Sequence, residues 1–206
     1  MVTGCQPADV VDPDLYRRLV SDLRANKKTV IADLTGPPLQ AALAGGVELL
    51  RLSDDELISE RYAASDSVED IVAGAQQLRA VGARHVLVSR ASAPAILLDD
   101  GHDRSHVELI PPVFEALDRR GTGDSMFAAT GVGLARGMSM IAALRLGMAA
   151  GALNATRRGL GTGTREEIER LASHVTVRPD PPGGSSLSAP RQQTATWRES
   201  RTSAPD

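Results

Sequence analysis

The sequence predicts an α/β fold in which a mostly parallel sheet carries an antiparallel edge. Over residues 1–90, short apolar runs rich in β-branched residues alternate with helical patterns, as in parallel sheets joined by helical crossovers. Residues 85–110 then hold three short apolar runs with no helical pattern between them, which indicates antiparallel hairpins. A glycine-rich turn at residues 121–123 follows and opens a region of two helices.

The first half of the chain carries clear helix-start signals. Asp12 is a preferred N-cap residue, and Pro13 suits the first position of a helix. Ser67 and Asp70 have capping-box spacing before an apolar stripe. The inner face of the first helix is predicted to comprise Leu15, Tyr16, Leu19, Val20 and Leu23. In chain order we expect a strand end and turn at 2–7, a helix at 12–26, a strand at 29–34, a helix at 39–44, a strand at 47–52, a helix from 53 and a helix at 67–81.

The second half is predicted to change from strands to helices and then to a tail. Expected strands lie at 85–89, 95–99 and 105–110, with Asp100-Gly101 as a turn, and expected helices at 124–136, 139–157 and 164–173. From Pro179 onward the sequence is rich in Pro, Gly, Ser, Thr and Arg, so it cannot bury enough apolar area to offset the entropy of ordering. We therefore expect one domain at residues 1–178 and a disordered tail at 179–206.

Length and charge narrow the range of functions. A chain of 206 residues can bury the core of one domain, and a net charge of -3 offers no electrostatic basis for binding nucleic acid or an anionic membrane. No apolar run approaches the roughly 20 residues that span a bilayer, and no signal peptide is visible. Cys5 is the single cysteine, which excludes an internal disulfide. A cytoplasmic protein is expected.

The glycine-rich turn predicts an anion pocket. Gly121 and Gly123 allow a sharp turn that exposes backbone N–H groups, and the following helix adds the positive end of its dipole. Such a turn suits a phosphoryl group, and Asp124 beside it could take a proton from an attacking hydroxyl. The alternative is that the glycines only form a tight turn and Asp124 only caps the helix. A Gly-x-Gly-x-x-Gly motif would need glycine where Met126 stands, and no P-loop ending is present.

The run Asp118-Arg-Arg-Gly-Thr-Gly-Asp124 resembles the second signature of the ribokinase-like (PfkB) carbohydrate kinases, Asp-x-x-Gly-Ala-Gly-Asp. The resemblance implies a truncated ribokinase-like three-layer α/β/α sandwich. It also implies ATP as the phosphoryl donor, with Mg²⁺. Gly121, Thr122 and Gly123 would form the anion hole, with Thr122 in place of the family's alanine, and Asp124 would be the catalytic base.

The same resemblance suggests metal-proximal carboxylates. The family has Asn-x-x-Glu at a strand-to-helix turn, and here Ser53 replaces the asparagine while Glu56 keeps the acidic position. Asp33 matches an acidic strand end in the phosphofructokinase branch. Since Mg²⁺ keeps several waters, few protein carboxylates are needed. The alternative for both residues is an acidic helix start or loop with no metal.

Nucleotide-binding positions are implied in two further places. Ser89-Arg-Ala91 stands where the family has Ser/Thr-x-Gly after a strand, and Ala91 replaces that glycine. The segment containing Met148 and Gly151 resembles the family's Asn-Ala-Ala-Gly-Ala helix beside the adenine, with Met148 in place of asparagine. Together with Ser53, the nucleotide-binding candidates are Ser89, Ala91, Met148 and Gly151.

The resemblance covers residues 2–177 and only the C-terminal portion of the family's fold; its sugar-contacting Gly-Gly-Asn signature is absent. Missing strands would expose apolar surface and favour a homo-oligomer. The expected function is ATP-dependent phosphoryl transfer to a hydroxyl of a sugar or sugar phosphate, as in the phosphofructokinase branch. The alternative is a non-catalytic kinase remnant that at most binds nucleotide. A dinucleotide-binding dehydrogenase domain fits poorly, because the glycine turn follows many strands instead of the first.

Overall fold

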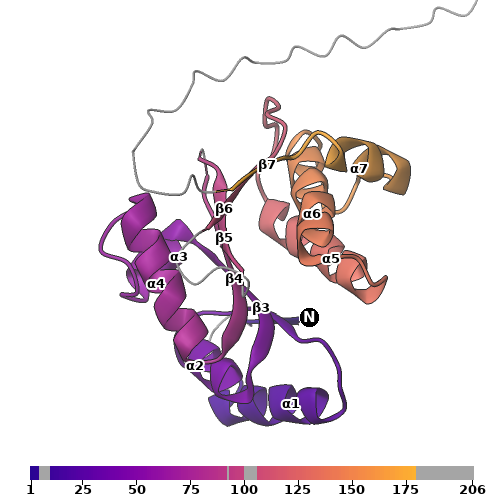
Figure 1. Ribbon diagram of the computed structural model, residues 1–206. Helices are drawn as coiled ribbons and strands as arrows, with labels where there is room; N and C mark the ends of the chain where they lie inside the picture. The colour runs from indigo at the N-terminus through magenta and orange to yellow at the C-terminus, as the bar shows by residue number, and fades with distance from the viewer. Residues whose placement is uncertain (5–9, 92, 100–105, 180–206) are drawn as a thin grey trace, which may run out of the picture.

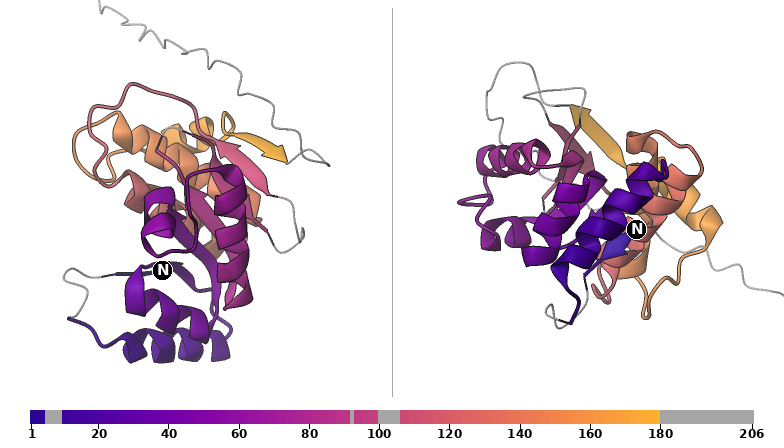
Figure 2. Two further views of the ribbon diagram at one scale, coloured as in Figure 1. Left: turned by 90° about the vertical axis from the view of Figure 1, so that its left-hand side faces the viewer. Right: turned by 90° about the horizontal axis from the view of Figure 1, so that it is seen from below.

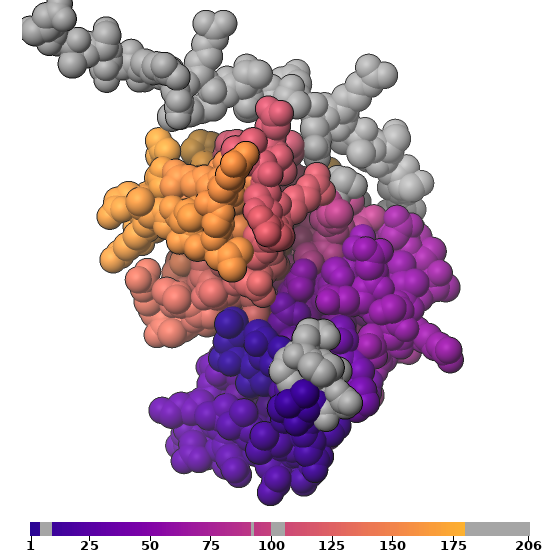
Figure 3. Space-filling view, turned by 180° about the vertical axis from the view of Figure 1, so that it is seen from behind, coloured from indigo at the N-terminus to yellow at the C-terminus, as the bar shows by residue number. Residues whose placement is uncertain are grey.

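The computed structural model describes residues 1–4, 10–91, 93–99 and 106–179, and the described strands form one sheet with helices on both faces. Figures 1 and 2 show α1–α4 on one side of this sheet and α5–α7 on the other. The space-filling view in Figure 3 shows the orange helices and the purple helices as separate regions of the surface. This is the predicted three-layer α/β/α arrangement.

The sheet has the order β1-β2-β3-β4-β5-β6-β7. Its first four strands pair in parallel and the later ones pair antiparallel, as predicted. Parallel neighbours need a crossover, and α1, α2 and α3–α4 supply the crossovers on one face. The strands are β1 (Val2–Thr3), β2 (Ile31–Asp33), β3 (Val47–Ser53), β4 (Ala83–Ser89), β5 (Ala95–Leu98), β6 (Val107–Ile110) and β7 (Thr176–Pro179).

Strand β7 enlarges the antiparallel part beyond the predicted hairpins. It pairs with β6, and Arg178 forms an ion pair with Glu108 across the two strands. Its four residues carry no strong apolar alternation, so only pairing with a strand distant in sequence identifies it. The strand also places Pro179 in the sheet, one residue beyond the predicted domain boundary.

Most helices begin where the sequence signals predict, whereas α2 and α5 begin earlier. Asp12 caps α1 by accepting from the N–H of Asp14 at 2.9 Å, and complete capping boxes start α3 and α7. Helix α2 begins earlier than expected because Gly36 and the prolines after it occupy its first turn. The helices are α1 (Pro13–Ala25), α2 (Gly36–Gly45), α3 (Asp54–Ser59), α4 (Val68–Ala80), α5 (Thr122–Ala135), α6 (Met140–Ala155) and α7 (Arg165–Ala172).

Two apolar clusters fill the space on either side of the sheet. On β3, Leu50 and Leu52 belong to the cluster under α1–α4, whereas Leu49 belongs to the cluster under α5 and α6. Successive strand residues point to opposite faces, so Arg51 lies on the same face as Leu49. The sheet therefore directs Arg51 toward the helices that follow the glycine turn.

The predicted inner face of α1 is only partly correct. Tyr16 and Val20 are buried, but Leu15 is 48% exposed in relative area and Leu19 is 43% exposed. The helix packs so closely on α2 that a Cβ added at Gly45 would lie 2.8 Å from the Cβ of Val20. Only the stripe facing α2 is covered, and the neighbouring leucine stripe remains at the surface.

Some predicted features lie outside the described residues. These are Cys5, the Asp100-Gly101 turn and nearly all of the predicted tail. Within the described ranges, no helix combines the length and apolar character needed to cross a membrane.

Candidate active site

The glycine turn begins α5 with a backbone that only glycine adopts easily. Gly121 is the N-cap residue, and its φ of 68° lies in the left-handed region. A Cβ at this position would also lie 2.3 Å from Cδ2 of Leu160. Asp124 is the third residue of α5 and is exposed, so the interpretation of Asp124 as the N-cap is wrong. Among the described residues, its carboxylate has no hydrogen-bond or ion-pair partner.

The turn presents unpaired backbone donors beside Asp124. The N–H of Thr122 donates to the carbonyl of Arg119 at 3.3 Å, but no hydrogen bond among the described residues has the N–H of Gly121, Gly123 or Asp124 as its donor. Helix N-termini leave such groups free, and the helix dipole adds partial positive charge there. The predicted anion pocket therefore has its donors available.

Arg51 joins the ends of three parallel strands below this turn. Its Nη1 contacts Oδ2 of Asp33 on β2 at 3.1 Å, and its Nη2 donates to Oγ of Ser89 on β4 at 2.8 Å. A Cβ added at Gly123 would lie 3.2 Å from Nη2 of Arg51. The guanidinium thus lies directly against the glycine turn, and the sheet edge and the anion pocket form one site.

The site holds more acidic than basic charge. Burial is the largest cause that raises the pKa of Asp33; Arg51 opposes this rise, while the charges of Glu56 and Asp124 add to it. Asp124, the predicted base, therefore lies close enough to Asp33, the predicted metal-proximal residue, for its charge to raise the pKa of Asp33. A bound cation would relieve the repulsion among these three carboxylates.

Glu56 is engaged in the start of α3. Its Oε2 accepts from the backbone N–H of Ser53 at 2.7 Å and from the Ser53 hydroxyl at 2.9 Å, and it lies 3.8 Å from Nη1 of Arg51. No cluster of three or more Asp, Glu, His or Cys residues that could hold a metal occurs in the part of the chain that the structure describes. With only Asp33 and Glu56 near Arg51, a magnesium ion at this edge of the sheet would need water and phosphate oxygens as most of its ligands.

The predicted nucleotide-binding residues occupy different surroundings. Ser89 accepts a hydrogen bond from Arg51, Ser53 is hydrogen bonded to Glu56, and Ala91 is exposed in the segment after β4. A Cβ added at Gly151 would lie 3.0 Å from the carbonyl oxygen of Thr122, so this glycine allows α6 to pack against the turn. Met148 is 5% exposed and packs in the core under α5 and α6. Its side chain is therefore not available to contact a ligand in this structure.

Two polar residues at the site escaped the sequence analysis. Arg51 is a charged residue inside the apolar run of β3, and this interruption was the signal that could have identified it. Asn154, near the end of α6, is 2% exposed and hydrogen bonds to the carbonyl of Arg120 at 2.9 Å. No local sequence motif indicates that Asn154 would contact the glycine turn.

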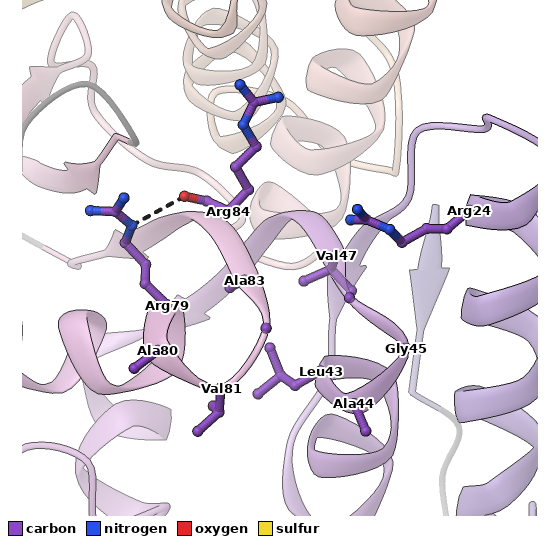
Figure 4. Close-up of a pocket in the computed structure, with 12 residues that line it drawn as sticks. Arg24, Leu43, Ala44, Gly45, Val47, Arg79, Ala80, Val81, Ala83 and Arg84 are labelled. Carbon is purple, nitrogen blue, oxygen red and sulfur yellow. Dashed lines mark hydrogen bonds between the residues drawn. The ribbon is translucent and has the colours of Figure 1, made fainter.

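A surface hollow at the other end of the sheet is unrelated to this site. Figure 4 shows Arg24, Arg79 and Arg84 around it, where α2 and α4 end and β3 and β4 begin. Arg79 donates through Nε to the carbonyl of Arg84 at 3.2 Å. Cations complement the partial negative charge at helix C-termini, which accounts for these arginines without a ligand.

Comparison with known proteins identifies a family. Residues 6–167 match the pfkB family carbohydrate kinase profile. The chain is 32% identical over 171 residues to ATP-dependent 6-phosphofructokinase isozyme 2 of Mycobacterium tuberculosis, covering 83% of this chain and 49% of that relative. It is 27% identical over 164 residues to 1-phosphofructokinase of Bacillus subtilis, covering 80% of this chain and 52% of that relative.

Solved structures agree with these matches. Phosphofructokinase-2 of Escherichia coli in complex with potassium superposes with a TM-score of 0.69 at 26% identity, covering 80% of this chain and 53% of that chain. Ribokinase of Arabidopsis thaliana, solved with ribose and ATP, gives a TM-score of 0.69 at 22% identity, covering 78% of this chain and 53% of that chain. The latter likeness shows the fold alone. The chain spans about half the length of the curated relatives it matches.

Proposed function

The chain belongs to the pfkB family of carbohydrate kinases, and we propose that it serves ATP-dependent phosphoryl transfer to a hydroxyl group of a sugar or sugar phosphate, as in the phosphofructokinases. The observation that carries this proposal is the exposed carboxylate of Asp124 in the first turn of α5, beside the unpaired N–H groups of Gly121 and Gly123. A proton acceptor next to an anion pocket is the arrangement that phosphoryl transfer to a hydroxyl requires.

In the proposed mechanism Asp124 accepts the proton of the acceptor hydroxyl as that oxygen attacks the γ-phosphorus of ATP. The bond between this phosphorus and the β–γ bridging oxygen breaks, and ADP leaves. The N–H groups of Gly121 and Gly123 donate to the phosphoryl oxygens, whose charge must be stabilised during transfer. Thr122 is the first residue of α5 and lies between these two glycines, and its place in the proposed anion hole rests on that position. Arg51 supports the pocket from below, since it lies against Gly123 and is held by Asp33 and Ser89.

A magnesium ion is part of the proposal. Asp33 and Glu56 are the residues that would face it, because both carboxylates lie at Arg51 and the acidic charge there exceeds the basic charge. When bound, the ion supplies positive charge to the nucleotide phosphates. Ser53, Ser89, Ala91 and Gly151 remain proposed neighbours of the nucleotide, and Met148 supports the shape of that region from within the core.

The partners and location follow from the reaction. We propose a sugar or sugar phosphate as the substrate, with neither nucleic acid nor a membrane as a partner, and a cytoplasmic location where ATP is available. A homo-oligomer is proposed because Leu15 and Leu19 form an exposed apolar stripe on α1. One related structure, of Escherichia coli phosphofructokinase-2, is described as a tetrameric inhibited form.

The test measures ATP·Mg²⁺ binding to the full chain by calorimetry, together with turnover on fructose phosphates. Asp124→Asn removes the base, and loss of a general base typically costs about 10²- to 10⁴-fold in rate. Asp14→Asn is the matched control, because Asp14 is also an exposed acid in the first turn of a helix but lies on α1, on the opposite face of the sheet.

Each outcome has a distinct meaning. Binding with turnover that is lost in Asp124→Asn and kept in Asp14→Asn supports the kinase. Binding without turnover supports the alternative of a non-catalytic chain that holds nucleotide. Absence of both overturns the proposed function.

A further inference from the structure

Asn154 is a buried polar residue with two backbone partners that lie far apart in sequence. Its side chain is near the C-terminal end of α6 and is 2% exposed. Nδ2 donates to the carbonyl of Arg120 at 2.9 Å, and Oδ1 accepts from the N–H of Gly161 at 2.9 Å. Since a carbonyl can only accept and an N–H can only donate, these partners define the orientation of the carboxamide.

The bond to Arg120 determines the direction of a donor in the anion pocket. The carbonyl of Arg120 and the N–H of Gly121 belong to one peptide unit, which is planar and trans, so the two groups point in opposite directions. With the carbonyl held toward α6 by Asn154, the Gly121 N–H points away from α6. This N–H is one of the unpaired donors at the glycine turn within the described residues.

We propose that Asn154 is a positioning residue for the phosphoryl pocket: it sets the direction of the Gly121 N–H and thereby the anion affinity of the glycine turn. This inference rests on the proposed phosphoryl-transfer function and extends it to a residue on α6. The pocket is then built from the α5 turn and oriented by the neighbouring helix.

The second contact of Asn154 supports the same role. By accepting from Gly161, the side chain holds the segment after α6 in place. Leu160 of that segment covers Gly121, where an added Cβ would lie 2.3 Å from Cδ2 of Leu160. A single carboxamide therefore holds both the last peptide before the turn and the side chain that covers it.

The chain before the glycine turn is also attached to α6 by hydrogen bonds that do not involve Asn154. The N–H groups of Leu117 and Asp118 already donate to the carbonyl of Ala155 at 2.8 and 3.1 Å. These bonds hold the chain before the turn against the end of α6, but neither of them involves the carbonyl of Arg120 or the N–H of Gly121. The added contribution of Asn154 is the orientation of the Arg120–Gly121 peptide.

The test uses the full chain labelled with ¹⁵N and titrates it with inorganic phosphate while the Gly121 amide resonance is followed by NMR. The wild type is expected to show a shift of this resonance on binding. Asn154→Ala removes both contacts, whereas Asn154→Asp keeps the shape and the acceptor for Gly161 but cannot donate to Arg120 when ionised. Both variants should bind phosphate about tenfold more weakly, because a misdirected donor in such a pocket loses much of its contribution.

Asn26→Ala is the matched control, since Asn26 Nδ2 makes the same kind of bond, to the carbonyl of Asp22 at 2.8 Å, at the end of α1. This control should leave phosphate affinity and the Gly121 shift unchanged. The titrations of Asn154→Asp are run at a pH at which the introduced carboxyl group is ionised, since a protonated carboxyl could still donate to Arg120. Thermal unfolding of each variant under the same conditions separates loss of fold from loss of orientation.

The outcomes distinguish this inference from the proposed function. Wild-type phosphate binding at Gly121 together with wild-type affinity in folded Asn154→Asp overturns the positioning role and leaves the phosphoryl pocket intact. No phosphate-dependent shift at Gly121 in the wild type overturns the pocket, and the positioning role with it. Weaker binding in Asn154→Asp at unchanged stability supports the role.

Discussion

Arg51 and Asp33 form an ion pair of 3.1 Å at the ends of two neighbouring parallel strands, with side chains only 15% and 16% exposed. The pair lies under the glycine turn and links the sheet to the proposed phosphoryl pocket. In parallel sheets, sites form at the carboxyl ends of the strands, and this pair occupies that edge. Its charges affect both stability and function.

Replacement of Arg51 should destabilise the fold. Arg51→Met leaves Asp33 buried without a cation and removes the donor to Ser89, and breaking a buried pair costs about 3 kcal/mol. Arg17→Met is the control, because the Arg17–Asp14 pair is 48% exposed on both sides and such pairs contribute less than about 1 kcal/mol. Urea unfolding of both variants measures the difference. An equal loss of unfolding free energy in the two variants would show that the buried pair stabilises the fold no more than the exposed pair.

The raised pKa of Asp33 predicts a stability contribution that declines with rising pH. The folded state holds this proton more tightly than the unfolded chain, whose pKa is near 3.8. The contribution is therefore full below pH 3.8 and is lost as the pH rises through the folded value. As the pH rises through this range, the free energy of unfolding of Asp33→Asn should therefore increase relative to that of the wild type. Unfolding curves across pH give this difference, and a constant difference would contradict the prediction.

Glu167 should show the opposite dependence. Its pKa is lowered from 4.5 to about 2, first by the backbone N–H of Thr164 and then by Arg157. A lowered folded pKa gives stability that is present above pH 4.5 and lost as the pH falls toward 2. Glu167→Gln should therefore lose less stability than the wild type on acidification over this range. If the two proteins lost the same stability on acidification, the capping-box carboxylate of Glu167 would not be the source of this pH dependence.

Gly123→Ala should weaken anion binding without weakening the fold. The added Cβ would lie 3.2 Å from Nη2 of Arg51, which is held by Asp33 and Ser89 and must shift to accommodate it. Alanine in a helix is favoured over glycine by roughly 0.8–1.0 kcal/mol, which offsets part of the crowding. We expect severalfold weaker phosphate binding by calorimetry at nearly unchanged melting temperature. A large fall in melting temperature with unchanged binding would reverse this assignment.

Much of the fold and part of the site follow from local sequence. The helix starts at Asp12, Ser67 and Thr164 are encoded within three or four residues, because capping side chains bond to nearby N–H groups. The glycine turn is similarly local, because Gly121 needs a left-handed backbone at the start of α5. The alternation of strand and helix likewise predicted the parallel half of the sheet.

Other predictions depended on contacts that no local pattern contains. The inner face of α1 was overestimated, because periodicity identifies an apolar face but not how much of it a neighbouring helix covers. Met148 lies at a position matched by resemblance to a nucleotide-bordering helix, yet packing under α5 and α6 buries it. The alternative in which Asp124 only caps the helix is wrong, because α5 starts at Thr122, two residues before the predicted start, and Gly121 is the N-cap residue.

By itself, the sequence determined the fold class, the helix starts, the glycine turn and the family that its motif indicates. Only the tertiary structure decided that Arg51 joins Asp33 and Ser89, that Asn154 holds Arg120, and that β7 completes the sheet. The physical reason is the range of the interactions. Caps and turns form within a few residues, whereas these contacts join residues 18, 38 and 34 positions apart, which come together only when the sheet and its helices have packed.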